Sequence, residues 1–499
     1  MIKSFQCTKI FWIAAFAFTA ALHLAGIFQP FLGNFAQHQT DYATVVQRWL
    51  AEGIHPLDPV MRFIAEGKNR LFMGDIPLNI TITAFTCKLT GLSIEMVGRG
   101  LSAMFFFLSI YPLYRLLQLV FKDQTLTLLT VLFYSFSPLT MIYGQAFLLE
   151  MTALSFGIFA YYFYFRWWYQ NSTVLLLVSA FFFSLMLGTR IYYAPLILPL
   201  ALLFLKRFGW KSFIQWRIYL FLLIVLFAPV SWQAYAKHFA NLHGDQSSLE
   251  DNLRVFVSLA SVLNLKFLAA FTHISFTKIV TPAGFILALP ALFIAPKYFR
   301  KSIQFVFLIF LSFLPLVLMA PRKFIEFEYY YLPFVPVFSL LAAIGIKSLE
   351  KFFQISLIKI SLLVIATVLL SLRYSVAPVL IVPDEDRFVL EAAKKVREIA
   401  PRDSRVIASH GSGTSFLFYT DRDGWAFELP ENIRGVRNLG DIQGSAIERL
   451  ERFRSQGAVY FALADKRQMS QNPAFFDYLK SRYKLAAESP HYLIYSLEK

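Results

Sequence analysis

Apolar residues along the chain form long runs, and polar residues gather in the short segments between these runs. Each run is about as long as an α-helix needs to be to cross the hydrocarbon core of a bilayer. The pattern predicts a polytopic α-helical membrane protein with about eleven spans. The predicted spans cover residues 10–28, 97–121, 124–141, 150–165, 173–189, 191–205, 218–236, 281–296, 303–320, 330–346 and 359–375.

Two further apolar segments, 76–90 and 255–272, are shorter or contain polar residues such as Lys88, Asn264 and Lys266. We expect both to form interfacial or re-entrant helices rather than spans. Whether the total number of spans is odd or even depends on whether these two segments cross the membrane.

Basic residues set the predicted orientation. Lys and Arg concentrate in every second connection, for example at 206–217, 297–301 and 347–359, and such connections stay cytoplasmic. The N-terminus is then cytoplasmic, while residues 31–96, 237–280 and everything after about 376 lie outside. The formal net charge of +16 follows this loop pattern and gives no indication of nucleic acid as a partner. The only cysteines, Cys7 and Cys87, lie in different segments and predict no disulfide.

After residue 376 the pattern changes from long apolar runs to alternating short helices and strands. This alternation predicts a small α/β domain. The division is a membrane domain at 1–375, which carries the outer loop 31–96, and an outer domain at 376–499. The predicted helices of the tail are 384–400, 445–456 and 475–483, and its predicted strands are 405–409, 457–463 and 491–497.

The first outer loop begins with the stretch "HQTDYATVVQRWLAEG". Thr40 is an expected N-cap, Asp41 falls in the first turn, and Gly53 ends the helix. One apolar face is expected, made of Tyr42, Val45, Val46, Trp49 and Leu50. An acid in a first turn complements the helix dipole, so Asp41 has a purely structural explanation as well as a functional one. His38 precedes it by one turn.

Other charged residues lie at predicted outer ends of spans. Glu150 is either a cavity-facing carboxylate or an interfacial acid. Arg190 is unusual on the outer side, and it can hold a phosphate or anchor the chain at lipid headgroups. The same alternatives apply to a later cluster, in which the tyrosines can also form an interfacial belt. This cluster comprises Arg322, Lys323, Glu328, Tyr329 and Tyr330.

Acids on one side of a membrane can activate an acceptor hydroxyl as general base, and basic residues can stabilise a phosphate leaving group. The combination suits group transfer from a lipid phosphate, and it would equally suit a lipid transporter. A purely structural membrane component would leave the outer charges unexplained.

These segments resemble the GT-C superfamily of polytopic glycosyltransferases, in the bacterial branch of protein O-mannosyltransferases and lipid A aminoarabinose transferase. The resemblance is carried by an acid before an amphipathic helix in "HQTDYATVVQRWLAEG" and by the Pro- and Arg-containing "GDIPLNITITAFTCKLTGLSIEMVGRGLSAMFFF". It extends to the Ser-Pro break and downstream acid of "LFYSFSPLTMIYGQAFLLEMTALSF", to "FEYYYLPFVPVFSLLAAIGI", and to the outer C-terminal domain.

The resemblance implies an inverting glycosyltransferase of the bacterial inner membrane. Such enzymes take a sugar from a polyprenyl-phosphate donor and give it to a lipid, glycan or protein. By this resemblance Asp41 is catalytic, Glu150 and His38 bind acceptor or a divalent metal ion, and Arg190, Arg322 and Lys323 bind the donor phosphate. Glu328, Tyr329 and Tyr330 line the site.

The chain departs from its relatives at two positions. Tyr42 stands where many relatives have a second acid, and Glu328 stands where they often have histidine before the late tyrosine pair. The metal requirement and the acceptor therefore stay open. The competing hypothesis is a flippase of lipid-linked sugars, which would require polar residues through the span centres.

Overall fold

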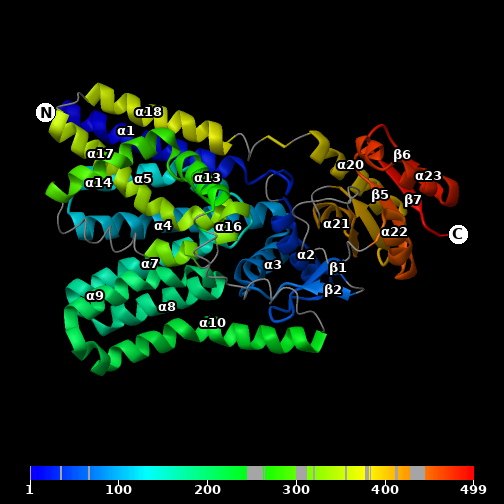
Figure 1. Cartoon of the computed structure of the whole chain (residues 1–499), viewed down its shortest axis with the longest axis horizontal. Coiled ribbons are helices and arrows are strands. Elements are labelled where there is room, and N and C mark those ends of the chain that lie inside the picture. The colour runs from blue at the N-terminus through cyan, green and yellow to red at the C-terminus, as the bar shows by residue number, and fades with distance from the viewer. Residues whose placement is uncertain are drawn as a thin grey trace. The chain divides into compact units, whose positions relative to one another are not determined.

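The apolar runs of the sequence fold into helices, and the tail folds into a sheet covered by helices (Figure 1). The computed structural model describes residues 2–33, 36–65, 68–243, 262, 264–298, 312–318, 321–353, 357–376, 381–382, 384–410, 414–427 and 444–498. The chain forms two compact units. The first comprises Met1–Ile27, Arg99–Ala236 and Asn252–Leu380, and the second comprises Phe28–Gly98, Lys237–Asp251 and Ile381–Lys499.

In its described part the first unit contains helices and no strands. In chain order its elements are α1 (Ile2–Ala25), α4 (Ile94–Phe121), α5 (Gln124–Ser135), α6 (Pro138–Tyr143), α7 (Glu150–Gln170), α8 (Thr173–Thr189), η1 (Ile191–Ile197), α9 (Leu198–Phe208), η2 (Gly209–Ile214), α10 (Trp216–His243), α13 (Leu265–Ile274), η3 (Ser275–Ile279), α14 (Thr281–Tyr298), α16 (Pro321–Glu326), η4 (Glu328–Phe334), α17 (Val335–Phe353), α18 (Leu357–Ser371) and η5 (Leu372–Val376).

Several of these helices can cross a membrane. Within the described ranges, 4 helices are long and apolar enough: Ile94–Phe121, Ile191–Ile214, Trp216–Leu242 and Glu328–Leu349. The pair Leu265–Ile279 and Thr281–Leu289 passes the same test but is bent by 103°. The polytopic helical class is therefore confirmed, while the count of about eleven spans stays a prediction. Most of the predicted span 303–320 lies outside the described residues.

Local chemistry sets the helix ends in the first unit. The Asp123 side chain accepts a hydrogen bond from the backbone N–H of Leu126 and so caps α5. The same carboxylate forms an ion pair with Lys347, which ties α5 to α17. Asn171 ends α7 in the left-handed conformation, which asparagine tolerates better than most residues.

The second unit is built around one seven-stranded mixed sheet with the order β2-β1-β4-β3-β5-β7-β6. The strands β1, β4, β3 and β5 are parallel, while β2, β7 and β6 pair antiparallel at the edges. The strands are β1 (Val60–Ala65), β2 (Lys68–Leu71), β3 (Arg405–Ser409), β4 (Gly424–Ala426), β5 (Ala458–Leu463), β6 (Lys484–Glu488) and β7 (Leu493–Ser496), and the helices of this unit are α2 (Ala36–Glu52), α3 (Leu78–Thr90), α20 (Asp384–Ile399), α21 (Thr414–Thr420), α22 (Ala446–Ser455), η6 (Lys466–Gln471) and α23 (Pro473–Arg482).

The tail forms the α/β fold that the sequence predicts. All three predicted helices and all three predicted strands of the tail are present within a residue or two. The apolar faces of α22 and α23 pack on the sheet, and their core includes Leu450, Phe461 and Phe475, each at most 1% exposed. The central strand β3 is buried from its second residue onward, as a parallel strand covered on both faces should be.

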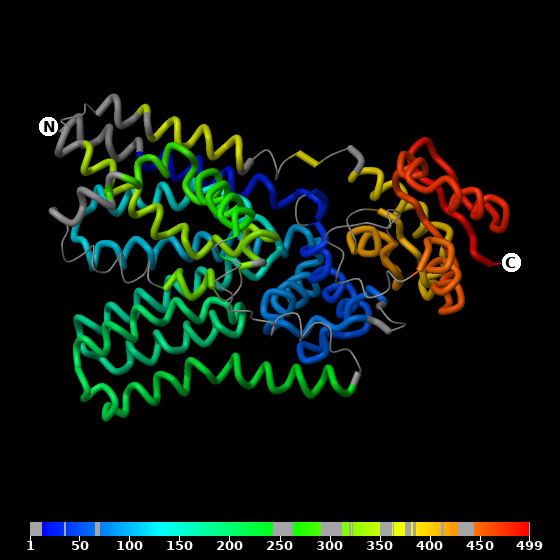
Figure 2. Tube along the Cα trace, in the orientation of Figure 1, coloured from blue at the N-terminus to red at the C-terminus, as the bar shows by residue number. Residues whose placement is uncertain are grey.

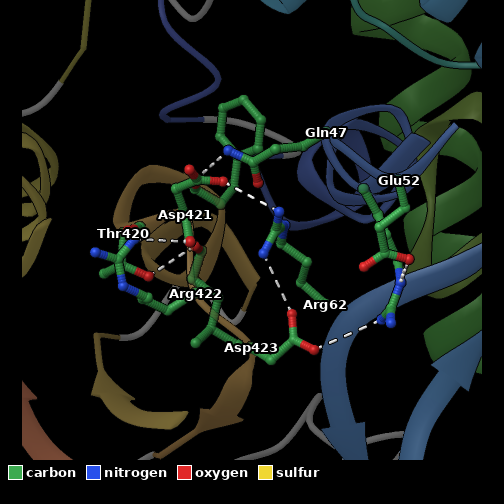
Figure 3. A network of polar contacts seen from close by, with 10 residues as sticks. Gln47, Glu52, Arg62, Thr420, Asp421, Arg422 and Asp423 are labelled. Atoms are coloured by element: carbon green, nitrogen blue, oxygen red, sulfur yellow. Dashed lines mark hydrogen bonds and ion pairs between the residues drawn. The ribbon is translucent and has the colours of Figure 1, made fainter. Parts of the chain in front are cut away.

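The segment predicted as the first outer loop contributes to this same sheet. Strand β1 pairs with β4 through Phe63 and Gly424, so residues far apart in sequence lie side by side (Figure 2). The polar network of Figure 3 reinforces this pairing: Arg62 contacts Asp421 and Asp423, both at 3.3 Å, and Gln47 of α2 donates to the Phe418 carbonyl. The loop and the tail are therefore one folded body.

Helix α3 covers most of the predicted segment 76–90. Its 13 residues are too few to cross a bilayer. One face, including Ile80 and Ala84, is buried, whereas Phe85 and Leu89 are 49% and 84% exposed. An exposed apolar face on a short helix suits an interfacial position.

Candidate active site

Asp41 lies inside α2 rather than at its beginning. The helix starts at Ala36, so the prediction of an N-cap at Thr40 is wrong; the Thr40 hydroxyl donates to the Ala36 carbonyl within the helix. Asp41 therefore sits beyond the first turn, where the helix dipole offers a carboxylate little stabilisation. The structural explanation for an acid at this position is correspondingly weak.

The buried face of α2 is largely the one predicted. Tyr42, Val45, Val46 and Trp49 are buried, but Leu50 is 39% exposed and does not belong to that face. Gly53 follows the helix with a φ of 117°, a conformation that favours glycine, and so ends it as predicted.

A hydroxyl from the tail binds the Asp41 carboxylate. Thr414 Oγ1 donates to Asp41 Oδ1 at 2.6 Å, and the two threonine hydroxyls of Thr40 and Thr414 lie 2.9 Å apart. His38 Nδ1 lies 4.0 Å from Asp41 Oδ2, with side chains 36% and 22% exposed. The structure thus brings the two predicted residues of α2 together and adds Thr414.

The surroundings of Asp41 raise its pKa to about 6. Burial is the main cause because it disfavours the charged carboxylate, while the Thr414 hydrogen bond and the charge of Arg70 on β2 act in the opposite direction. A carboxyl group with a pKa near 6 is ionised at neutral pH and is a better proton acceptor than an ordinary aspartate.

Sequence reasoning missed Thr414 and Arg70. Thr414 begins α21 shortly after β3, in the stretch "RVIASHGSGTSF", where a strand, a Gly-rich segment and a helix follow one another. Such a strand-to-helix junction is a usual place for functional side chains in α/β sheets. That signal marks Thr414 as interesting without linking it to Asp41.

In the first unit, buried polar contacts position Glu150 at the start of α7. The preceding non-helical segment is bound by α4, where Arg99 donates to the Gln145 carbonyl at 2.9 Å and Ser102 donates to the Ala146 carbonyl at 2.6 Å. The Gln145 side chain in turn accepts from the Gly26 N–H at 2.8 Å. These contacts fix the backbone from which Glu150 projects.

Glu150 and Arg190 form a buried ion pair. Arg190 Nη2 lies 2.5 Å from Glu150 Oε1, and the side chains are 14% and 0% exposed respectively. The second carboxylate oxygen, Oε2, makes no hydrogen bond within the described residues. Arg190 therefore has a structural partner, and Glu150 keeps one oxygen able to accept a further hydrogen bond.

Tyrosines surround this pair. Glu150, Arg190 and Tyr330 are all close enough to act electrostatically on the Tyr192 hydroxyl, and the Tyr192 and Tyr330 rings lie 4.4 Å apart. The Tyr329 ring lies 5.0 Å from that of Tyr330. The predicted site residues of the late tyrosine segment thus gather around the Glu150–Arg190 pair.

Glu328 belongs to the same cluster. Its carboxylate and that of Glu150 both act on the Tyr143 hydroxyl, and Glu328 Oε1 lies 3.7 Å from Lys278 Nζ. Lys278, which sequence reasoning missed, lies in η3 just before the 103° bend of that helix pair. Broken helices of this kind commonly bring charged groups into a site.

Two predicted phosphate ligands remain, Lys323 and Arg322. Lys323 in α16 places its ammonium 5.4 Å from the Phe327 ring centre. The Arg322 side chain lies outside the described residues.

The predicted site residues therefore form two groups, one in each unit. Asp41 and His38 belong to the second unit, and Glu150, Arg190, Glu328, Tyr329 and Tyr330 belong to the first. In the described part of the chain, no three His, Cys, Asp or Glu side chains converge as metal ligands would.

Residues 77–232 match the family described as dolichyl-phosphate-mannose-protein mannosyltransferase. This match covers less than half of the chain, and it agrees with the resemblance carried by the sequence motifs.

Solved structures share the fold across nearly the whole chain. ArnT from Cupriavidus metallidurans bound to undecaprenyl phosphate is 10% identical with a TM-score of 0.66, covering 97% of each chain. The Archaeoglobus fulgidus oligosaccharyltransferase is 12% identical with a TM-score of 0.57, covering 91% of this chain and 68% of its own. Mycobacterial arabinofuranosyltransferase AftD is 12% identical with a TM-score of 0.52, covering 97% and 41%. No curated protein matches the sequence.

Proposed function

We propose that the protein transfers a sugar from a polyprenyl-phosphate-linked donor to a hydroxyl of a lipid, glycan or protein acceptor at the outer face of a bacterial inner membrane. The observation that carries the proposal is the partly buried Asp41 carboxylate, hydrogen-bonded to Thr414 at 2.6 Å and with a pKa raised to about 6. The fold relationship to ArnT bound to undecaprenyl phosphate supports the choice of donor.

In the proposed reaction Asp41 accepts the proton of the acceptor hydroxyl. The acceptor oxygen then bonds to the anomeric carbon from the side opposite the leaving group, which inverts the configuration. The bond between this carbon and the phosphate oxygen breaks, and polyprenyl phosphate leaves with the electron pair. Arg190, Arg322 and Lys323 are proposed to stabilise that phosphate, while Glu150 accepts a hydrogen bond from substrate through its second oxygen.

The decisive variant is Asp41→Asn, which preserves shape but removes the base. We expect transfer to fall by about two to four orders of magnitude, the usual contribution of a general base, with unchanged expression and membrane insertion. Asp58→Asn is the matched control, since Asp58 is an exposed acid shortly after α2, and it should transfer normally. Retained transfer in Asp41→Asn would remove Asp41 from the chemistry.

The assay should use purified protein in detergent, with a polyprenyl-phosphate sugar as donor. In detergent there is no second compartment to which a flippase could move the donor. Chemical consumption of the donor under these conditions therefore indicates an enzyme and not a flippase. Absence of consumption across lipid, glycan and peptide acceptors, together with sugar-lipid movement in vesicles, would favour the flippase hypothesis.

A further inference from the structure

A cavity of about 550 Å³ lies between the C-terminal halves of α4 and α7, within the first unit. Its polar lining includes Tyr111, Arg115, Gln118, Tyr162, Arg166 and Gln170. None of these residues belongs to the candidate active site, and the proposed transfer reaction gives none of them a role.

The lining is rich in hydrogen-bond donors and carries positive charge. The Arg115 guanidinium lies 6.0 Å from the Tyr111 ring centre, and that of Arg166 lies 5.8 Å from the Tyr162 ring centre. No ion pair of either arginine is seen among the residues that the structure describes, and no carboxylate lines the cavity. Arg166 donates a hydrogen bond to Gln170 Oε1 at 3.5 Å. Two guanidinium groups beside one cavity repel each other unless an anion lies between them.

The cavity lies at the opposite end of the helices from the Glu150–Arg190 pair. Arg115 and Arg166 follow Arg99 and Glu150 by about 24 Å along α4 and α7, at roughly 1.5 Å per residue. This distance approaches the thickness of a hydrocarbon core. The cavity thus lies where the other membrane interface is expected.

An exposed apolar stripe on α4 leads to the cavity. Met104, Leu108 and Tyr111 are 43%, 45% and 60% exposed, and their spacing places them on one helix face with Arg115. An acyl chain can lie along this stripe while its headgroup reaches the arginines. A free phosphate ion has no apolar part that could contact this stripe.

We propose that this cavity binds the phosphate headgroup of an anionic glycerophospholipid from the leaflet opposite the Glu150 end of α7. The two guanidinium groups and the Tyr and Gln side chains hold the phosphate, and the α4 stripe holds an acyl chain. In the predicted orientation this is the cytoplasmic leaflet. The assignment is independent of the proposed transfer reaction.

The test measures binding of phosphatidylglycerol to the full-length purified protein in neutral detergent by native mass spectrometry. Arg115→Gln combined with Arg166→Gln should weaken binding about 30-fold, from roughly fivefold per basic residue near a lipid surface. Arg115→Gln alone, at an exposed position, should weaken phosphatidylglycerol binding about fivefold. This single variant replaces the double variant in the test if the double variant fails to fold. Lys206→Gln combined with Lys211→Gln removes two exposed basic residues outside the cavity and should leave binding unchanged.

Phosphatidylcholine and inorganic phosphate separate the alternatives. Inorganic phosphate competing at the same concentration as phosphatidylglycerol would overturn the lipid assignment in favour of a soluble anion. Equal binding of phosphatidylcholine, an equal loss in the lysine control, or wild-type affinity in the arginine variants would each overturn the site.

Discussion

The Thr414 hydroxyl favours ionisation of Asp41 and partly offsets the effect of burial, because a hydrogen bond donated to a carboxylate stabilises its charged form. If Asp41 is the base, the rate should rise with pH through about 6, where this carboxyl loses its proton. Thr414→Val removes the hydrogen bond at nearly constant volume, so the pKa of Asp41 should rise and the acid limb of the pH–rate profile should move up by about one pH unit.

Thr414→Ser is the control for this shift, because it restores a hydroxyl and should restore the wild-type profile. Arg70→Gln should move the limb in the same direction as Thr414→Val, since the Arg70 charge also favours the ionised form of Asp41. A Thr414→Val profile identical to the wild type would show that the hydroxyl does not act on the titrating group.

The Glu150–Arg190 pair requires a double-mutant cycle. Arg190→Gln alone leaves Glu150 charged in a fully buried position, and breaking a buried pair in this way costs about 3–5 kcal/mol of stability. Glu150→Gln with Arg190→Gln removes both charges and should recover much of the loss in thermal unfolding. If the stable double variant shows a higher KM for donor than Glu150→Gln alone, Arg190 binds donor beyond its structural role; a KM equal to that of Glu150→Gln would limit Arg190 to a structural role.

Individual site residues were predictable from sequence where an unusual charge stood out against an apolar background. Asp41, Glu150 and Arg190 stood out in this way. Their partners were not predictable, because Thr414 reaches Asp41, and Arg190 reaches Glu150, only through tertiary folding. The consequence for Arg190 is substantial: a presumed phosphate ligand proves to have an internal partner.

At the scale of elements, close helix packing explains Gly345 in α17. A Cβ atom at this position would lie 1.7 Å from the Leu287 carbonyl oxygen of α14. Gly345→Ala should therefore force the two helices apart and lower stability by about 1–3 kcal/mol, measured as the thermal unfolding midpoint in detergent.

Gly100→Ala is the matched control. Gly100 lies within α4, and an added Cβ there meets nothing within 4 Å. The change should be neutral or stabilising by up to about 1 kcal/mol, because alanine favours the helix. Equal midpoints for the two variants would contradict the packing argument.

Elements with a strong periodic pattern were predicted, and short ones were not. Helix α22 begins with a capping box at Ser445 and Glu448, and the spacing of these two residues is a local signal for a helix start. Strand β4 has three residues and exists because β3 and β1 flank it, and β6 is mostly exposed and lacks an apolar alternation. Strands that depend on distant partners leave little trace in local sequence.

At the scale of the whole molecule, the change from long apolar runs to a mixed pattern predicts a boundary at about residue 376. The sequence does not reveal that residues 28–98 belong to the same unit as the tail, because the pairing of β1 with β4 joins segments far apart in the chain. Asp41 and Glu150 consequently belong to different units. Asp41 depends on the integrity of the sheet, while Glu150 depends on the α4–α7 packing.

The predicted orientation can be tested through this division. An odd number of predicted spans separates Lys211 from the tail, so the two must lie on opposite sides of the membrane if the spans are right. Starting from a variant in which Cys7 and Cys87 are serine, single cysteines replace Lys211 and Glu398, both exposed. A membrane-impermeant maleimide should label Glu398→Cys in intact spheroplasts and Lys211→Cys only after permeabilisation.

The two cysteines distinguish the ways in which this topology can fail. Labelling of both in intact spheroplasts would show that a segment such as 255–272 crosses the membrane and alters the parity. Labelling of Lys211→Cys alone would show that the whole chain has the opposite orientation. Asp41 would then lie on the cytoplasmic side, where a general base could not serve an outer-leaflet acceptor. Only the labelling of Glu398→Cys alone keeps the sheet, and the acid it holds in place, on the side where the proposed transfer occurs.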